Sequence, residues 1–156
     1  MSLTVLILAA AGCSWDEPAR RGQSGGSGLP SESLSDPLAT VVTTARRQIG
    51  TPYRYGGNSP SGFDCSGLIQ YAYRSIGVTT PRTTGALWRE LPSTDKGLKP
   101  GDVLFFNIGG KPSHVGLYLG DGEFVHAPST GRRVSVAELT DPYYSKTFIR
   151  AGRVMD

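Results

Sequence analysis

The 156-residue chain contains only two cysteines, Cys13 and Cys65, and two histidines, His114 and His126. So few cysteines exclude a disulfide-rich scaffold, because such domains carry several cysteine pairs. A zinc site is disfavoured as well, since neither a C-x-x-C nor an H-x-x-x-H pair is present. The four residues can therefore be considered one by one as candidates for chemistry.

The sequence also lacks a strong charge of one sign and a long hydrophobic run. The formal net charge is +3, and the basic residues come partly in pairs rather than in a run with interleaved aromatics. This pattern argues against nucleic-acid binding. The 38% hydrophobic content and the length indicate one globular domain, and the 21 glycines and 11 prolines predict a turn-rich fold.

The N-terminal stretch "LTVLILAAAGC" is apolar and ends in small residues and a cysteine. It is too short for a membrane span but suits the apolar part of a signal peptide. It resembles a bacterial lipobox, although no Lys or Arg precedes it. We interpret residues 1–12 as a lipoprotein signal peptide and Cys13 as the lipidated residue, with Ser14 favouring the outer membrane by the same resemblance. A buried N-terminal strand or helix is the alternative.

Residues 14–37 are rich in Ser, Gly, Pro and charge and have no periodic apolar positions. Such a segment buries too little apolar surface to offset the entropy of ordering. We therefore predict a lipidated Cys13 followed by a flexible tether over residues 13–37, and a folded domain over residues 38–156.

Helices are predicted in the first half of this domain. Asp36 followed by Pro37 is typical of an N-cap and a first helical residue. We expect that helix to end at Gly50, a second helix to run from about Cys65 to Gly77, and "TTGALWREL" to form a third. Apolar residues at helical spacing form the predicted inner faces: Leu38, Val41, Val42, Ala45 and Ile49 in the first helix, and Leu68, Ile69, Ala72 and Ile76 in the second.

Strands are predicted in the second half. The segments "KPGDVLFFN", "HVGLYLG", "EFVHA" and "RRVSV" are typical of strands, and "FIRAGRV" follows a turn or short helix in "DPYYSKTF". Asp121-Gly122 between the second and third of these predicts a β-hairpin. Helices followed by an antiparallel sheet indicate an α+β architecture.

Cys65 falls in the first turn of the predicted second helix. Unpaired backbone N–H groups and the helix dipole there favour a thiolate, so we expect a lowered pKa and a nucleophilic sulfur. Two alternatives stay open at this point: a buried, inert cysteine and a Cys13–Cys65 disulfide.

The two histidines extend the case for nucleophilic chemistry. His114 begins one strand of the predicted hairpin and His126 ends the other, so both fall at its open end. A nucleophilic cysteine needs a base within hydrogen-bond reach and a third group that fixes the base's tautomer. Cys65, His114 and His126 would supply all three. A purely structural histidine and a zinc site are the alternatives.

Six motifs occur in order: "TPYRYGG", "FDCSGL", "PRTT", "LKPGDVLFF", "SHVGLYLG" and "FVHA". Together they resemble the NlpC/P60 family of papain-like cysteine peptidases over about residues 38–156. The resemblance implies a helical half that carries the nucleophile, packed on a small antiparallel sheet that carries the histidine pair. It also implies a peptidoglycan endopeptidase that needs no metal or other cofactor.

Carried over by motif position, the resemblance implies a role for each matching residue. Cys65 is expected to be the nucleophile, His114 the general base, His126 the orienting third member and Tyr53 a donor to the oxyanion hole. Four further residues are expected to line the substrate groove: Asp64, Ser66, Arg82 and Ser113.

Which amide bond would be cleaved stays open between D-Ala–diaminopimelate crosslinks and γ-D-Glu–diaminopimelate bonds. Two alternative functions are a thiol acyltransferase or transpeptidase on the same fold and a non-catalytic cell-wall-binding module. The expected partners are peptidoglycan and a membrane that holds the lipid on Cys13, with no nucleic acid. We expect a monomeric lipoprotein of the cell envelope, on the outer membrane and facing the periplasm.

Overall fold

The computed structural model describes residues 36–94 and 96–156. The predicted signal peptide, the predicted lipidation site Cys13 and nearly all of the predicted tether lie outside the described residues. Within them, Asp36 and Pro37 already belong to the folded domain, because they cap and begin its first helix. No helix in the described part of the chain is long and apolar enough to cross a bilayer.

Among the described residues, four helices occur near the predicted places: α1 Pro37–Arg46, α2 Cys65–Arg74, α3 Thr84–Glu90 and α4 Pro142–Thr147. The predicted end of α2 at Gly77 is wrong, because residues 75–77 form a turn. The predicted start of α1 is confirmed, since the Asp36 side chain accepts a hydrogen bond from the backbone N–H of Leu38. Its predicted end is wrong, because residues 47–50 form a turn and Ile49 is 49% exposed. Ile49 therefore contributes nothing to the inner face of the helix.

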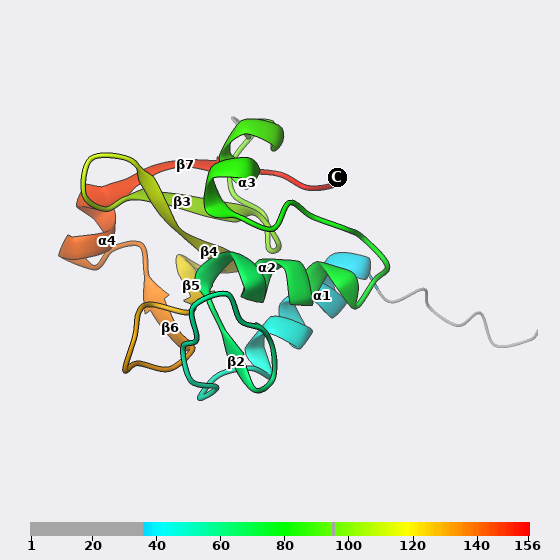
Figure 1. Cartoon of the computed structure of the whole chain (residues 1–156). Coiled ribbons are helices and arrows are strands. Elements are labelled where there is room, and N and C mark those ends of the chain that lie inside the picture. The colour runs from blue at the N-terminus through cyan, green and yellow to red at the C-terminus, as the bar shows by residue number, and fades with distance from the viewer. Residues whose placement is uncertain (1–35, 95) are drawn as a thin grey trace, which may run out of the picture. The chain divides into compact units, whose positions relative to one another are not determined.

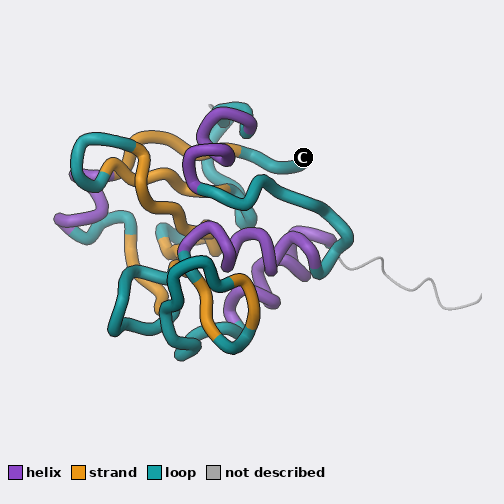
Figure 2. Tube along the Cα trace, viewed as in Figure 1, coloured by secondary structure: helices purple, strands orange, loops and turns teal. Residues whose placement is uncertain are grey.

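The same part of the chain contains seven strands: β1 Asn58–Ser59, β2 Gly62–Phe63, β3 Val103–Asn107, β4 Pro112–Gly120, β5 Glu123–His126, β6 Ser135–Glu138 and β7 Phe148–Gly152. The short strands β1 and β2 pair with each other, and the other five form an antiparallel sheet in the order β6-β5-β4-β3-β7. The α+β prediction is confirmed, with α1 and α2 gathered together beside the longer strands (Figures 1 and 2).

The hairpin between β4 and β5 has the predicted turn. Asp121 and Gly122 both have positive φ, 51° and 83°. Two consecutive positive φ angles are what a two-residue turn of type I′ requires, and asparagine, aspartate and glycine tolerate them best. The turn sets the pairing of Leu117 with Val125, and so fixes where the ends of the two strands meet.

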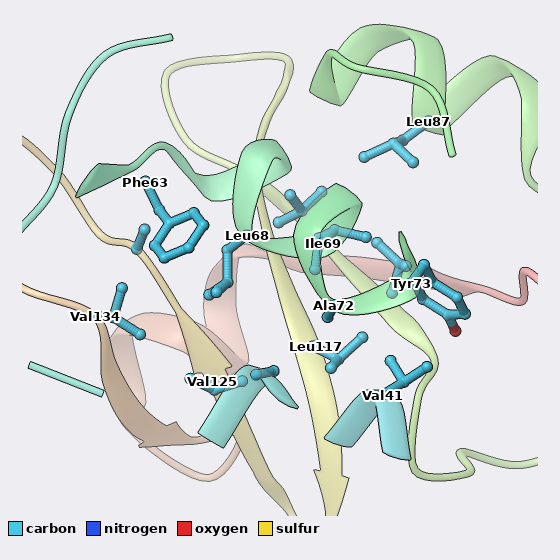
Figure 3. Close-up of a cluster of buried hydrophobic side chains, with 14 of the residues drawn as sticks. Val41, Phe63, Leu68, Ile69, Ala72, Tyr73, Leu87, Leu117, Val125 and Val134 are labelled. Carbon is cyan, nitrogen blue, oxygen red and sulfur yellow. The ribbon is translucent and has the colours of Figure 1, made fainter. Parts of the chain in front are cut away.

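Each face of the sheet buries an apolar cluster. Val103 and Phe105 of β3 pack towards the larger cluster, whereas Leu104 and Phe106 pack into a smaller one beside α4, as alternation along a strand requires. Figure 3 shows the centre of the larger cluster, where side chains of the helices meet those of the sheet. Its labelled members are Val41, Phe63, Leu68, Ile69, Ala72, Tyr73, Leu87, Leu117, Val125 and Val134. This packing fixes the start of α2 against the sheet.

Candidate active site

The candidate site begins at the N-terminus of α2, where the sequence places Cys65. Asp64 is the N-cap: its Oδ1 accepts the Gly67 N–H at 2.7 Å, and its Oδ2 accepts the Gly56 N–H at 3.0 Å. A Cβ at Gly67 would lie 2.0 Å from the Gly57 carbonyl oxygen, so the first turn of the helix approaches the preceding loop more closely than any side chain allows. The predicted placement of Cys65 in the first turn is confirmed.

Arg82 locks this helix start from the loop before α3. Its guanidinium contacts both carboxylate oxygens of Asp64, at 3.0 and 2.8 Å, and donates to the Ser66 hydroxyl at 3.1 Å. Burial alone would raise the pKa of Asp64, but the hydrogen bonds from Arg82 and Gly67 outweigh it and hold that pKa below its usual value. Arg82, Asp64 and Ser66 therefore form one mutually bonded unit next to the cysteine.

A cleft of about 440 Å³ opens over this helix start. It contains every residue that the sequence assigned to the nucleophile, the oxyanion donor and the groove: Tyr53, Asp64, Cys65, Ser66, Arg82 and Ser113. Four more residues complete its lining: Tyr55, Gly56, Thr83 and Thr84. The structure thus brings residues as far apart in the sequence as Tyr53 and Ser113 into one cleft. Their roles stay predictions.

The thiol of Cys65 is not ionised as readily as predicted. Burial is the largest influence and raises its pKa, and it outweighs the lowering by the Thr84 hydroxyl, 3.5 Å from Sγ, and by the Val115 and Ser66 N–H groups. The prediction of a lowered pKa is therefore wrong, because Cys65 is only partly exposed in the cleft and the surrounding protein removes much of the water that would stabilise a thiolate. Cys65 forms no disulfide in the described structure.

The two histidines are in contact, as the hairpin predicted. Nε2 of His114 lies 2.8 Å from Nδ1 of His126, and the side chains are only 6% and 2% exposed. Burial lowers the pKa of His114 to about 3, helped by His126, and lowers that of His126 to about 4, helped by the charge of Arg132. Both rings are therefore neutral near pH 7.

The cysteine and the histidine pair approach each other through the backbone of β4. The N–H group that faces the sulfur belongs to Val115, the residue directly after His114. Because Nε2 of His114 faces His126, Nδ1 is its remaining ring nitrogen, and that atom has no hydrogen-bond partner among the described residues.

The sequence analysis assigned no role to two residues of the site, although Thr84 belongs to the "PRTT" motif. Thr84 supplies the hydroxyl next to the sulfur, and Tyr144 of α4 has its hydroxyl 3.3 Å from Nε2 of His126. Neither belongs to a spacing pattern around Cys65, and only the folded chain brings α3 and α4 to the site. No three His, Cys, Asp or Glu side chains gather as metal ligands in residues 36–94 and 96–156.

Because both histidines are buried in the neutral form, we expect the free energy of unfolding of the domain to decrease in mild acid. The unfolded chain binds protons at histidine below about pH 6.5, whereas the folded chain resists protonation down to about pH 4 and 3. The unfolding free energy should therefore decrease as the pH falls below about 6.5, by up to about 1.4 kcal/mol per pH unit for each histidine. Denaturant melts at intervals between pH 7 and 4.5 measure this slope.

The chosen pH window separates this effect from that of the carboxylates. Asp64 has a lowered pKa, so its contribution is lost only below its ordinary value near 3.8. In the His126→Asn variant the slope should be about half that of the wild type, because one titrating group is gone. A stability that is flat from pH 7 to 4.5 would contradict the buried, neutral state of both rings.

A family model described as "NlpC/P60 family" matches residues 50–153 of the chain. Murein DD-endopeptidase MepH of Escherichia coli is 40% identical over 116 residues, which are 70% of this chain and 43% of that protein. Gamma-D-glutamyl-L-lysine dipeptidyl-peptidase of Bacillus cereus is 38% identical over 131 residues, 81% of this chain and 38% of that protein. The chain thus spans less than half the length of these two relatives.

A solved structure gives the same result. The crystal structure of an NlpC/P60 family protein from Bacillus cereus superposes with a TM-score of 0.72 at 35% identity, over 76% of this chain and 40% of that one. The matched span runs from the turn after α1 to the end of β7 and includes the cleft, Cys65 and both histidines. On sequence, fold and the residues around the cleft, the chain belongs to the NlpC/P60 family.

Proposed function

We propose that the protein is a cysteine endopeptidase that hydrolyses amide bonds in the stem peptides or crosslinks of peptidoglycan. One observation carries the proposal: Cys65 lies at a helix N-terminus in a cleft, beside the strand that holds a buried pair of neutral histidines in contact. The names of the two curated relatives, a murein endopeptidase and a dipeptidyl-peptidase, support the substrate class.

In this proposal Nδ1 of His114 takes the proton from the Cys65 sulfur as it attacks the amide carbonyl. His126 holds His114 through their 2.8 Å contact. His114 then gives the proton to the leaving amine, which departs and leaves a thioester on Cys65. Water, activated by the same imidazole, attacks the thioester carbonyl and releases the acid and the thiol.

The negative charge that develops on the carbonyl oxygen needs donors in the cleft. We assign the Cys65 N–H, in the first turn of α2 where backbone donors have no intrahelical partner, and the hydroxyl of Tyr53. Burial raises the pKa of Tyr53, with smaller contributions from Cys65 and Asp64, so the phenol keeps the proton that it would donate. Asp64, Ser66, Arg82 and Ser113 remain the proposed wall of the substrate groove.

Replacing Tyr53 by phenylalanine tests the oxyanion assignment. The ring and its packing stay, and the donor is lost, so kcat should fall by about 10²-fold or more. Initial rates of muropeptide cleavage measure the change. Tyr71→Phe is the matched control, because this α2 tyrosine packs its ring against Phe63 and its hydroxyl has no hydrogen-bond partner among the described residues. Equal kcat values for Tyr53→Phe and the control would remove Tyr53 from the oxyanion hole.

The names of the two relatives indicate different bonds, one in the crosslink and one within the stem peptide. Identification of the reaction products therefore has to show which bond this protein cleaves. Mass spectrometry of purified crosslinked and uncrosslinked muropeptides, before and after incubation with the protein, distinguishes them. Conversion of dimers to monomers indicates cleavage of the crosslink, and shortened stems indicate cleavage within the stem. An added amine that appears in the product mass would instead indicate acyl transfer. Intact substrates in all reactions would contradict the proposed function.

We further propose that the protein acts in the cell envelope, where its substrate class occurs. Anchoring through a lipid on Cys13, at the outer membrane, is the finer proposal and derives from the "LTVLILAAAGC" stretch alone. Metabolic labelling with an alkyne fatty acid tests it, since Cys13→Ser should abolish the label.

A further inference from the structure

Tyr144 of α4 lies behind the histidine pair. Its hydroxyl oxygen is 3.3 Å from Nε2 of His126, and the two rings meet edge to face with centroids 5.3 Å apart and planes at 88°. The three side chains form a continuous line of polar contacts: His114 to His126 at 2.8 Å, then His126 to Tyr144. The line begins at the proposed base and ends at Tyr144, and these two residues line a hollow next to the pair rather than the cleft that Cys65 lines.

We propose that Tyr144 is a positioning residue: its oxygen accepts the Nε2–H of His126 and thereby leaves Nδ1 of His114 free to take a proton from Cys65. The inference rests on the proposed function, in which His114 is the base. It adds a fourth member to the proposed set of Cys65, His114 and His126.

Only one direction of the hydrogen bonds is compatible with a base at His114. If Tyr144 accepts from His126, then Nδ1 of His126 is unprotonated and accepts from Nε2 of His114, and Nδ1 of His114 keeps its lone pair. If Tyr144 donates to His126, the order reverses along the line. His114 then carries its proton on Nδ1 and cannot take another there.

The same direction holds after proton transfer. His114 then carries protons on both nitrogens, so its Nε2–H must donate to Nδ1 of His126. His126 in turn must carry its single proton on Nε2, next to the Tyr144 oxygen. An acceptor at this place therefore favours the imidazolium form of His114 as well as the tautomer that precedes it.

The surroundings of the pair favour Tyr144 as the acceptor. The titratable or charged groups near His126 are His114 from β4, Tyr144 from α4, and Arg132 and Arg133 from the segment before β6. Burial and the Arg132 charge keep His126 from binding a second proton. A hollow of about 550 Å³ beside the pair is lined by His114 and Tyr144 together with Arg132 and Asp141. The hollow leaves room for the hydroxyl proton to point away from His126, so that the oxygen can accept the Nε2–H bond.

Packing holds the Tyr144 hydroxyl in place. The ring meets Phe106 at a centroid distance of 5.5 Å and Phe124 at 5.0 Å, both edge to face. Phe124 also contacts the ring of His126 at 5.1 Å. A substitution that keeps the ring but removes the hydroxyl therefore changes the hydrogen bond and little else.

The tautomers can be observed without any activity. In the full-length Cys65→Ala protein, long-range ¹H–¹⁵N correlation at pH 7 should show both histidines with the proton on Nε2. Adding Tyr144→Phe should give a mixture, with a share of both rings protonated on Nδ1. Protonation of His126 on Nδ1 in the parent, or identical spectra with and without the tyrosine hydroxyl, would overturn the proposal.

Kinetics supply the second test. In an otherwise wild-type chain, Tyr144→Phe should lower kcat/KM by about tenfold, as expected for one hydrogen bond. In a plot of kcat/KM against pH, the limb that reports deprotonation of the His114 imidazolium should move to lower pH by about half to one unit. Tyr143→Phe is the control, because the Tyr143 hydroxyl has no hydrogen-bond partner among the described residues. This variant should leave kcat/KM and the position of the pH limb unchanged.

The possible results separate this inference from the proposed function. An inactive wild type contradicts the function, and the tautomer spectra then still decide whether Tyr144 accepts from His126. An active wild type with an unchanged rate and pH profile in Tyr144→Phe retains the function and rejects the positioning role. If Tyr144→Phe does not fold, the tautomer of His126 in the Cys65→Ala parent gives the decision alone.

Discussion

The Cys65→Ala protein should release no soluble muropeptides from purified sacculi at a rate above background. Among the described residues that line the cleft, Cys65 alone carries sulfur, so in the alanine variant the histidine pair has no thiol from which to take a proton. Loss of a nucleophile that acts together with its base lowers the rate by about 10⁴-fold or more in comparable hydrolases. The fold should persist, because Asp64 caps α2 with its own side chain and does not depend on the thiol. Product release and circular dichroism of the same sample measure both.

Two controls make this result specific. Ser61→Ala changes a hydroxyl in the exposed turn between β1 and β2 and should cleave like the wild type. Binding of Cys65→Ala to sacculi should be retained, since the groove stays intact. If Cys65→Ala cleaves at the wild-type rate, the nucleophile assignment is wrong, and a folded wild type that binds sacculi without cleaving them supports the wall-binding alternative.

Asp64→Ala should destabilise the domain and impair activity together. The Asp64 carboxylate accepts five hydrogen bonds: from the backbone of Gly56 and Gly67, from the Ser66 hydroxyl and two from Arg82. Its side chain is 14% exposed and that of Arg82 is 32% exposed, so the substitution leaves a largely covered guanidinium without its partner. We expect a loss of about 3 kcal/mol, which lowers Tm by roughly 10 °C in a domain of this size.

The loss of activity in this variant has a structural cause. Without the N-cap and the ion pair, the first turn of α2 is no longer held, and it carries Cys65. Activity should therefore fall even well below the melting temperature of the variant, where the rest of the domain is folded. Thermal melts and initial rates at a temperature well below that Tm distinguish the two effects.

The ion pair between Arg46 and Glu123 supplies the matched control. Its atoms are 3.4 Å apart, and its side chains are 46% and 42% exposed. Glu123→Ala should change stability by no more than about 1 kcal/mol, because exposed ion pairs are screened by water. Equal effects of Asp64→Ala and Glu123→Ala would contradict the role assigned to the Asp64–Arg82 unit.

Local signals in the sequence were enough to predict much of this architecture. Asp36 with Pro37 and Asp121 with Gly122 each mark an element boundary, and both boundaries are found. These residues act through hydrogen bonds and φ angles within a few positions of themselves, so no distant part of the chain is needed to interpret them. The contact between His114 and His126 was predictable for the same reason, because one short hairpin joins their strands.

By itself, then, the sequence determined where the helices begin, which strands form the hairpin and which six motifs mark the family. Only the tertiary structure decided the ionisation of Cys65, whose burial outweighs the helix N-terminus and raises its pKa. It also decided that Arg82 pairs with Asp64 across 18 positions and that Tyr144 reaches His126 from α4. Burial, ion pairing and contacts between distant segments depend on how the elements pack, and packing is a property of the whole folded chain rather than of any local pattern.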